Sequence, residues 1–490
     1  MKKLLVILTI FLAKTNLSAQ VNVVSPTDGS LTIFPKGIID NRTYDPSKNF
    51  KFIALGDSAF KSNATGGDGV VAIGNKAMAK SQSVGYSVAI GEKSMYNATT
   101  GYANVAVGGA TLMNNTGYGN TAIGEGVLTK NTSGISNTGL GWGSLSSNIN
   151  GSRNVAIGTN TLANAKSTTD NIAIGTNALN AINHENLSYT RQTNMISIGS
   201  YSSQNLQVEL GASGFDIGNI IIGNYSFYNA AYGRGNVTLG HNTLYYASNT
   251  NSNTAIGNNS LHKLNVGSAV NYNGNTATGD HSLSELILGS NNTATGIASG
   301  NSLINGENNT FLGISSGVID IPSGEFVNNS MALGATAKVN ASNKVVIGNA
   351  SVSQIGGYAS WVNYSDRRLK ENIVYNNNLG LSFINALRTA SYTYKADSNK
   401  RRRDGLIAQD VQEVLKDQGV EFSGLIQDND TTKTLNLSYT ELVIPLINAV
   451  KELSNQSNNL KAEMNAMQKD METLKSLIQA KIDVKSPTDK

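Results

Sequence analysis

The chain has 490 residues, a length at which two or more structural units are expected. It contains 50 glycines, six prolines and no cysteine, with 14% charged and 39% hydrophobic residues. These values exclude a collagen-like chain, a highly charged disordered chain and a disulfide-stabilised one. Because the net charge is only +4 and no basic stripe alternates with aromatic residues, we expect no nucleic acid as a partner.

The first 19 residues have the pattern of a secretory signal peptide. Two lysines precede an apolar run from Leu4 to Leu12, and small residues at 17–19 suit a cleavage before Gln20. The run is too short to span a bilayer, and a buried strand or helix is the alternative interpretation. We therefore predict an exported protein, extracellular or at the cell surface, with no membrane-spanning segment in its mature chain.

From Phe52 to Gly348 a short motif recurs, in which an apolar residue, alanine, an apolar residue and glycine follow one another. A regular period of this kind indicates a solenoid. The glycines that end the motif lie mostly 17 residues apart, with longer insertions after the seventh: Gly74, Gly91, Gly108, Gly124, Gly141, Gly158, Gly175, Gly199, Gly223, Gly240, Gly257, Gly279, Gly296, Gly313, Gly334 and Gly348.

The residues of one repeat predict how a coil is built. Alternate residues of a strand face opposite ways, so Val105 and Val107 share one face while Ala106 lies on the other. Stacking the next coil about 4.8 Å away extends the backbone ladder and buries the apolar row. A second inward anchor is expected four residues after each glycine: Met78, Met95, Leu112, Leu128, Leu145, Leu162 and Leu179.

These coils resemble the head repeats of trimeric autotransporter adhesins, which share an apolar-Ala-Ile-Gly core. The resemblance implies a homotrimer built on a parallel β-roll. Since the period here is mostly 17 residues and that family has a shorter repeat, the resemblance does not fix how the coils wind. The predicted fold class is mainly β, a parallel β-roll or solenoid followed by a small α+β domain that ends in a coiled-coil helix.

Single residues within the coils give weak functional signals. The histidines at 184, 241, 262 and 281 are scattered without metal-ligand spacing, so we expect neither a metal nor a cofactor. Tyrosines near the longer insertions are the candidates for contact with a cell-surface glycan or protein, although packing is the favoured interpretation. They are Tyr189, Tyr201, Tyr225, Tyr228, Tyr232, Tyr245 and Tyr246.

After Gly348 the composition changes, because long side chains with helical periodicity replace glycine and asparagine. A connector over 349–364, containing Trp361, precedes this change. The periodicity then predicts a helix, a strand, a second helix and a second strand: Leu379–Ala390, Ser391–Ala396, Ala408–Asp417 and Val420–Ile426.

Three motifs follow one another in this part of the chain: SDRRLKENI from Ser365, GLIAQDV from Gly405, and SYTELVIPLINAVKEL from Ser438. Together they resemble the intramolecular chaperone auto-processing domain of endosialidase tail spikes and related trimeric phage fibres. The resemblance implies that residues 365–453 help three chains to assemble and then cut themselves off with a serine-lysine pair.

The same resemblance implies the nucleophile Ser365, its partner Lys370, a supporting Asp366 and a cut between Tyr364 and Ser365. A serine hydroxyl becomes a good nucleophile when a base takes its proton, and a lysine serves as base where burial or neighbouring cations disfavour its ammonium form. Attack within one chain and attack across chains both fit the sequence. The alternative is that Ser365 and Asp366 only cap a helix, but the two downstream motifs favour self-cleavage.

The last helical segment carries a heptad seam with lysine and glutamate on its flanks, which predicts a coiled coil rather than a membrane helix. Ser457 is the polar residue of the seam, so packing should be weakest there. One core position holds Leu446, Leu453, Leu460, Met467 and Leu474, and the other holds Val450, Ser457, Met464, Met471 and Ile478.

We therefore predict an exported homotrimeric, adhesin-like fibre whose C-terminal chaperone promotes assembly and cuts its own chain once, without turning over other substrates. The alternative is an uncleaved structural or receptor-binding tail-fibre-like protein with an inactive chaperone domain. A glycan-cleaving tail spike is disfavoured, because the repeats show no paired carboxylates in a separate insertion. The predicted segments are a signal peptide (1–19), an N-terminal segment (20–51), solenoid repeats (52–348), a connector (349–364), the chaperone domain (365–453), a coiled coil (454–482) and a polar tail (483–490).

Overall fold

The computed structural model describes residues 52–61, 68–182, 191–207, 218–266, 272–322, 324–397, 399–428 and 432–484. The predicted signal peptide and N-terminal segment, and the polar tail from residue 485, lie outside the described residues. The chain divides into two compact units, one ending at Ser167 and the other beginning at Thr168.

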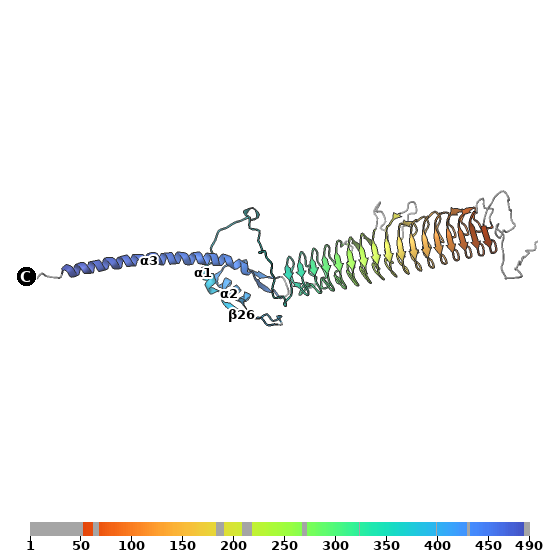
Figure 1. The fold of residues 1–490 in the computed structure, drawn as a ribbon. Coiled ribbons are helices and arrows are strands. Elements are labelled where there is room, and N and C mark those ends of the chain that lie inside the picture. Colours follow the sequence, from red (N-terminus) through yellow and green to blue (C-terminus); the bar gives the residue numbers. More distant parts are fainter. Residues whose placement is uncertain are drawn as a thin grey trace, which may run out of the picture. The chain divides into compact units, whose positions relative to one another are not determined.

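The first unit is a parallel β-solenoid, as the 17-residue period predicts. Its short strands stack in register, so that Val105, Ala106 and Val107 pair with Thr121, Ala122 and Ile123 of the next coil. Figure 1 shows the stacked strands in red and orange. The strands of the main sheet are β1 (Phe52–Leu55), β2 (Val70–Ile73), β4 (Val88–Ile90), β6 (Val105–Val107), β7 (Thr121–Ile123), β8 (Thr138–Leu140) and β9 (Val155–Ile157), and a second sheet pairs β3 (Ser83–Gly85) with β5 (Thr100–Tyr102).

The small middle residue of each strand faces the interior of the coil. Ala106 is fully buried, whereas Val105 and Val107 lie half-buried on the outer face. The anchors four residues after each glycine, such as Leu112, are fully buried, as predicted. The prediction that the apolar strand residues also point inward is wrong. The anchors already fill the interior, and a methyl group at Gly139 would come within 2.5 Å of the Val127 side chain.

The glycine after each strand forms a corner that other residues cannot adopt. Gly74 has φ +127°, and a Cβ on it would lie 2.6 Å from the carbonyl oxygen of Gly91 in the next coil. Both the backbone angle and the close approach of the next coil therefore require glycine. The motif glycine is thus what allows successive coils to stack at strand spacing.

A ladder of buried asparagines satisfies the backbone before many of the strands. The backbone N–H of Asn236 donates to Asn219 Oδ1 at 2.8 Å, and Asn236 Nδ2 donates to the carbonyl oxygen of Thr250 at 2.8 Å. Asn253 repeats the pattern by donating its backbone N–H to Asn236 Oδ1 at 3.0 Å. Because these side chains are fully buried, each ladder bond replaces one that water would otherwise supply.

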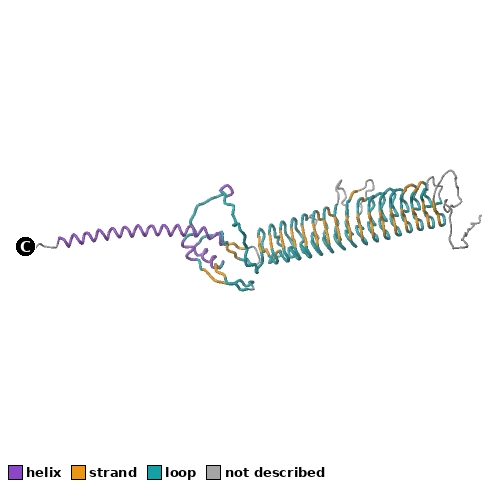
Figure 2. Tube along the Cα trace, viewed as in Figure 1, coloured by secondary structure: helices purple, strands orange, loops and turns teal. Residues whose placement is uncertain are grey.

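The second unit begins with the same kind of solenoid, drawn as orange strands joined by teal turns in Figure 2. Its main sheet contains β11 (Ile172–Ile174), β13 (Ile196–Ile198), β14 (Ile220–Ile222), β16 (Val237–Leu239), β18 (Thr254–Ile256), β19 (Thr276–Thr278), β20 (Thr293–Thr295), β21 (Thr310–Leu312), β23 (Met331–Leu333) and β25 (Val345–Ile347). Short parallel pairs join β10 (Thr168–Thr169) to β12 (Arg191–Gln192), β15 (Tyr232–Arg234) to β17 (Asn249–Asn251), and β22 (Gly317–Val318) to β24 (Lys338–Val339).

One coil of the second unit exchanges its large and small interior residues. Gly300 stands where other coils have a leucine anchor, and Phe311 stands where neighbouring strands have alanine. A Cβ at Gly300 would lie 2.8 Å from the Phe311 ring, so the phenylalanine occupies the volume that the missing anchor leaves. The interior therefore keeps its total volume while the sequence motif changes.

The second unit ends in a small α+β region. Its elements are η1 (Arg367–Leu369), α1 (Leu381–Ala386), an antiparallel pair of β26 (Thr389–Tyr392) and β27 (Arg403–Leu406), α2 (Ala408–Gln418), an antiparallel pair of β28 (Leu425–Gln427) and β29 (Leu435–Leu437), η2 (Tyr439–Leu442) and α3 (Val443–Val484). The mainly β solenoid and the α+β region that ends in a helix confirm the predicted fold class.

The short elements of this region differ in their bounds from the prediction. Helix α1 stops at Ala386 because Leu387 turns to an extended backbone, and the chain enters β26 where helix was expected. Helix α2 has nearly its predicted bounds and ends at Gly419, which takes the left-handed conformation typical of a helix C-cap. Strand β28 covers only the end of its predicted range.

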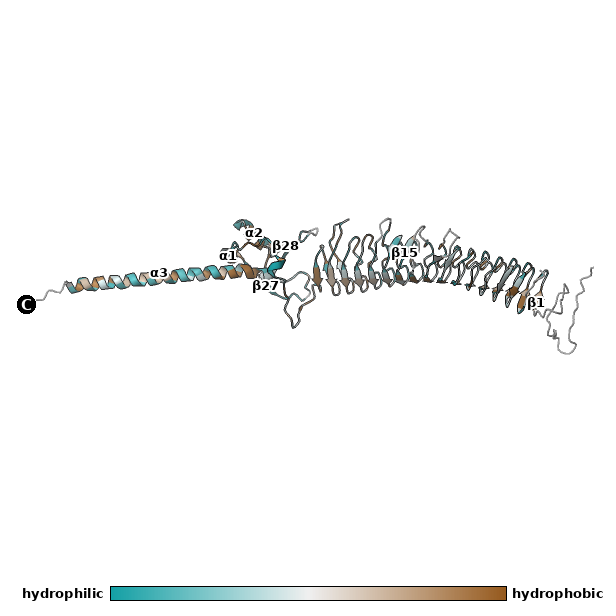
Figure 3. Ribbon diagram, turned by 90° about the horizontal axis from the view of Figure 1, so that it is seen from above, coloured by the Kyte–Doolittle hydropathy of each residue, from teal (hydrophilic) through white to brown (hydrophobic). Residues whose placement is uncertain are grey.

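Helix α3 is 42 residues long and continues through the predicted heptads without a break. Figure 3 shows hydrophobic and hydrophilic residues alternating along it. Within the described ranges, none of the helices combines the length and the apolar composition that a membrane span requires.

Candidate functional site

Ser365 and Lys370 come together at the predicted site. Lys370 Nζ donates a hydrogen bond to Ser365 Oγ at 2.8 Å. Between the two residues the chain makes the single turn of η1. Two backbone hydrogen bonds close this turn, from Leu369 N–H to the carbonyl oxygen of Asp366 and from Lys370 N–H to the carbonyl oxygen of Arg367. Because Lys370 leaves the turn with an extended backbone, its side chain reaches back across the five-residue separation.

Asp366 holds this turn and makes its contacts with Arg368. Its carboxylate accepts a hydrogen bond from the Arg368 backbone N–H at 2.8 Å and another from Arg368 Nη2 at 2.7 Å. These hydrogen bonds, led by the one from the guanidinium group, lower the pKa of Asp366. Asp366 therefore acts as the N-cap of η1, and the positive charge of Arg368 is paired. Its supporting role in cleavage stays a prediction.

The peptide bond between Tyr364 and Ser365 lies in an exposed stretch. The side chains of Trp361, Val362 and Tyr364 are 86%, 90% and 95% exposed in the single chain. Ser365 and Lys370 are exposed as well. The chain thus presents the bond, the hydroxyl and the amine in one accessible turn, beside apolar side chains that have no cover of their own.

The region behind this turn has a small core of its own. Phe383, Val411, Leu415 and Phe422 are buried together, and the rings of Phe383 and Phe422 lie 5.7 Å apart. Helix α3 joins this core through two polar contacts. Glu452 Oε2 accepts from the Leu381 backbone N–H at 2.9 Å, and Asn448 Nδ2 donates to the Leu379 carbonyl oxygen at 3.0 Å.

The comparisons with known proteins identify this region. Residues 365–420 match the family model described as chaperone of endosialidase. Over these residues the chain carries the intramolecular chaperone domain of this family. The match begins at Ser365, the first residue of the turn just described. A comparison with curated proteins found no match. The resemblance of the coils to adhesin heads stays a prediction.

Within the chaperone domain, the structure explains why two of the sequence motifs occur together. Tyr439, in the motif that opens η2, accepts a hydrogen bond from the Leu406 backbone N–H at 2.7 Å. A side chain at Gly405 would collide with the same Tyr439 hydroxyl. Nearby, a hydrogen bond with Tyr394, then burial and the approach of Tyr439, raises the pKa of Tyr392 to about 12. Gly405 and Tyr439 thus hold η2, which leads into α3, against strand β27.

The heptad seam of α3 is uncovered in the single chain. Leu453, Leu460 and Met467 are 56%, 60% and 69% exposed, and Val450 and Met464 from the other core position are 64% and 67% exposed. A stripe of large apolar side chains along one helix is typical of a coiled-coil seam. The second unit therefore ends in a helix suited to self-association.

The tyrosines proposed for ligand contact gather into one aromatic cluster in the second unit. The rings of Tyr201 and Tyr225 stack 4.9 Å apart, and those of Tyr228 and Tyr245 stack 5.2 Å apart. Because stacked rings cover each other's faces, this arrangement favours packing between coils, the preferred interpretation from sequence. Tyr232 lies in β15 and is partly exposed, whereas Tyr189 lies outside the described residues.

The histidines take part in the same stacking or in local contacts. His262 stacks on Tyr245 at 5.4 Å, His241 meets Tyr225 edge-on at 6.1 Å, and His281 Nδ1 lies 3.0 Å from Asp280. His184 lies outside the described residues.

Sequence reasoning missed one ion pair of the second unit. Lys344, just before the last strand of the solenoid, lies 2.5 Å from the carboxylate of Asp428, next to β28. Neither residue belongs to a motif, and 84 residues separate them. No local sequence signal could have paired them.

Proposed function

We propose that this protein is an exported, homotrimeric fibre whose chaperone domain assembles three chains and then cuts each one between Tyr364 and Ser365. The observation that carries the proposal is the Lys370–Ser365 hydrogen bond of 2.8 Å at the first residues of the chaperone family match. Trimer assembly comes from the family, and export comes from the signal-peptide pattern of the first 19 residues.

The exposed seam of α3 supports self-association. A soluble helix with this many exposed leucines and methionines is stable in water when a partner helix covers them. The heptad spacing itself does not choose between two and three strands, so the number three rests on the family. Parallel association of α3 would bring the chaperone domains of the three chains to one place.

The outer face of the solenoid supports the same assembly. Each strand places its two flanking residues outward, and many of these are large and apolar. In the first unit the exposed ones are Ile53, Leu55, Ile90, Ile123 and Leu140, and in the second unit they are Ile172, Ile220, Val237, Leu239, Leu312, Met331, Val345 and Ile347. In the first unit Leu55, Ile90 and Leu140 lie in one apolar row, because successive strands stack in register. In the second unit Thr278 and Thr295 interrupt the corresponding row. Such a row is expected to pack against other chains.

In the proposed reaction the Ser365 hydroxyl attacks the carbonyl carbon of Tyr364, while Lys370 as the neutral amine takes the hydroxyl proton. The bond from that carbon to the Ser365 nitrogen breaks, the nitrogen gains the proton, and an ester joins Tyr364 to the Ser365 oxygen. One water then hydrolyses the ester, which leaves a carboxylate on Tyr364 and a free amino group on Ser365. The nucleophile sits at the new terminus, so each chain is cut once.

Assembly is expected to precede the cut. Trp361, Val362 and Tyr364 are apolar and nearly fully exposed, so packing of three chains would cover them together with the adjacent turn. Covering excludes water and disfavours an ammonium group, which is what a lysine base requires. The reaction would then act as a check, because chains that do not assemble keep their chaperone attached.

Intact mass tests the cut. The mature chain and its Ser365→Ala and Lys370→Met variants are expressed beside Ser353→Ala, a serine of the exposed connector, as the matched control. We expect fragments meeting at Tyr364 and Ser365 in the unmutated and control proteins. Both site variants should stay whole, a rate loss of about a thousandfold or more. Whole chains in all four samples would reject self-cleavage and favour the uncleaved fibre with an inactive chaperone.

A further inference from the structure

We propose that Lys344 and Asp428 form a latch that holds the chaperone domain on the last coils of the solenoid after the chain is cut. Lys344 belongs to the fragment before Ser365, and Asp428 belongs to the fragment after it. The proposal rests on the proposed self-cleavage and adds the fate of the released fragment. The partner that this surface binds is thus the C-terminal fragment of the protein itself.

The latch is an ion pair with supporting hydrogen bonds. Lys344 Nζ lies 2.5 Å from Asp428 Oδ2 and also donates to Asn340 Oδ1 at 2.8 Å. Asn340 Nδ2 in turn donates to the same Asp428 oxygen at 3.1 Å. The three side chains therefore close a triangle in which both residues from the solenoid, Asn340 and Lys344, address one carboxylate from the chaperone domain.

The burial of Asp428 makes this contact specific. Its side chain is 8% exposed and that of Lys344 is 28% exposed, whereas most ion pairs of the described chain are far more open to water. Burial alone would raise the pKa of Asp428, but hydrogen bonds from Lys344, Asn436 and Asn340 together lower it. The carboxylate is therefore held in its charged form, and losing Lys344 would leave a buried charge without its counterion.

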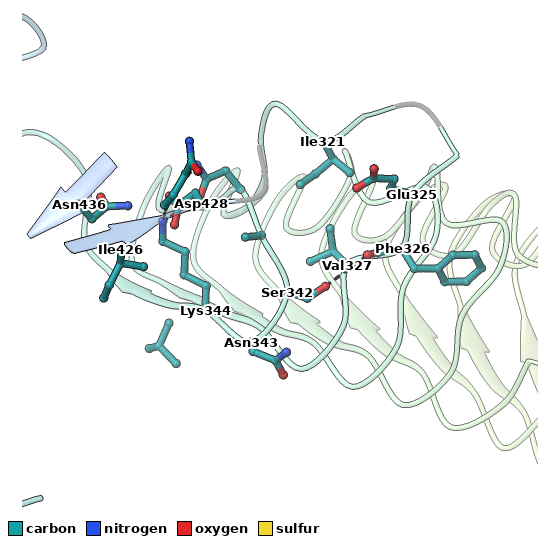
Figure 4. A pocket seen from close by; sticks show the side chains of 14 residues that line it. Ile321, Glu325, Phe326, Val327, Ser342, Asn343, Lys344, Ile426, Asp428 and Asn436 are labelled. Carbon is teal, nitrogen blue, oxygen red and sulfur yellow. Dashed lines mark hydrogen bonds and ion pairs between the residues drawn. The ribbon is translucent and has the colours of Figure 1, made fainter. Parts of the chain in front are cut away.

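The ion pair lies beside an open cavity. The ion pair lies at the edge of a cavity of about 640 Å³ that residues of the last coils and of the β28–β29 hairpin line together. Figure 4 shows Lys344 reaching toward Asp428, with Ile426 and Asn436 of the hairpin beside it. An open cavity contributes little packing, so the ion pair and its hydrogen bonds are the contacts that the test below addresses.

Before the cut, the connector is the covalent link between the same two regions that the ion pair joins. Residues 351–379 are almost all exposed, and the cut falls inside this stretch, so the connector itself would offer little hold on the fragment. After the cut, the chaperone domain stays on the solenoid only as long as noncovalent contacts such as Lys344–Asp428 last. An assembly of three chains would carry three such ion pairs, and together they would hold the associated fragments more strongly than one pair holds a single fragment.

A cut that does not depend on Ser365 separates the latch from self-cleavage. In a Ser365→Ala background, a site for a sequence-specific protease replaces residues around Gly356 and Gly357, where added side chains would meet no neighbour. The assembled protein is cut, and retention of the C-terminal fragment is followed by size exclusion at low and high salt. The variants are Asp428→Asn, Lys344→Met and the double variant, with Asp417→Asn as the control because Asp417 is exposed on α2.

We expect the parent and the control to retain the fragment at low salt and to lose it faster as salt rises. Asp428→Asn and Lys344→Met should each raise the release rate of the fragment about tenfold. The increase in the double variant should be smaller than the product of the two single increases. Equal release from the parent and all variants, or a parent that loses its fragment at once, would overturn the latch. Whether the native chain cuts itself is read separately from intact mass, so the two proposals fail in different ways.

Discussion

The solenoid and the chaperone domain solve the problem of stability in different ways. In the solenoid every coil repeats the same backbone constraints, and strand, glycine corner and asparagine ladder are each satisfied by the next coil. The chaperone domain has a small core around Phe383 and a long helix whose apolar seam has no cover within the chain. The first region is therefore stabilised by neighbouring coils, whereas the apolar seam of the second suits the proposed association with other chains.

This difference suggests an order of assembly. A helix with local contacts forms quickly, whereas a stack of parallel coils has no stable unit until several coils are in place. A chaperone domain that associates first would hold the three last coils side by side and give the solenoid a place to start. Substitutions that affect one region and not the other test this order.

The largest effect is expected at a solenoid corner. Gly223 has φ +143°, and a Cβ there would collide with the Gly240 carbonyl oxygen. Gly223→Ala should therefore lower the free energy of unfolding by about 4 to 6 kcal/mol, through backbone strain and overpacking together. Thermal unfolding followed by circular dichroism measures it. The control is Gly356→Ala in the connector, where a Cβ meets nothing within 4 Å. If the two variants unfold alike, the close-approach account of the corner is wrong.

The next effect concerns the core of the chaperone domain. Phe383 is 1% exposed and packs on Phe422, so Phe383→Ala should cost about 3 to 5 kcal/mol and unfold this small domain before the solenoid. Limited proteolysis should then remove the C-terminal region while the coils resist. Tyr375→Ala, at a position that is 86% exposed, should leave the pattern of the parent. Simultaneous loss of both regions would show that they unfold as one.

A smaller effect is expected in the asparagine ladder. Asn236→Ala removes the side-chain acceptor of the Asn253 backbone N–H and a donor to the Thr250 carbonyl oxygen, which should lower the free energy of unfolding by about 2 to 3 kcal/mol. Hydrogen exchange should show faster exchange of the Asn253 amide and of neighbouring coils. Asn229→Ala, an exposed asparagine of the same solenoid, serves as control. Unchanged protection at Asn253 would mean that water replaces the ladder.

The smallest effect has the opposite sign. Ser457 is the polar residue of the exposed α3 seam, so Ser457→Leu should stabilise the associated helix by about 1 kcal/mol per chain. The melting temperature of the assembled protein should rise and depend on concentration. Asn455→Leu, outside the seam, should not have this effect. A lower melting temperature for Ser457→Leu would contradict the coiled-coil assignment.

What the sequence predicts well is what repeats or lies within a short motif. The period, the glycine corners and anchors such as Leu112 follow from local spacing. Ser365 and Lys370, whose side chains lie 2.8 Å apart, are instead singled out by the resemblance of three motifs to a known family. Which strand face points inward does not follow, because alternation defines two faces without saying which one is inside. Only the volume already filled by the anchors decides it.

The remaining misses arise from contacts distant in sequence. The bounds of α1 and β26 depend on a sheet partner, β27, more than ten residues away, which outweighs local helical periodicity. The Lys344–Asp428 pair joins residues 84 positions apart in segments with no shared pattern. Such contacts become visible only when the chain is folded.

The most direct test of the account is the native mass of the purified mature protein together with the masses of its chains. We expect the unmutated protein to be an assembly of three chains, each cut after Tyr364. The Ser365→Ala protein should also be an assembly of three, but with whole chains. A monomeric protein with whole chains in both samples would contradict it.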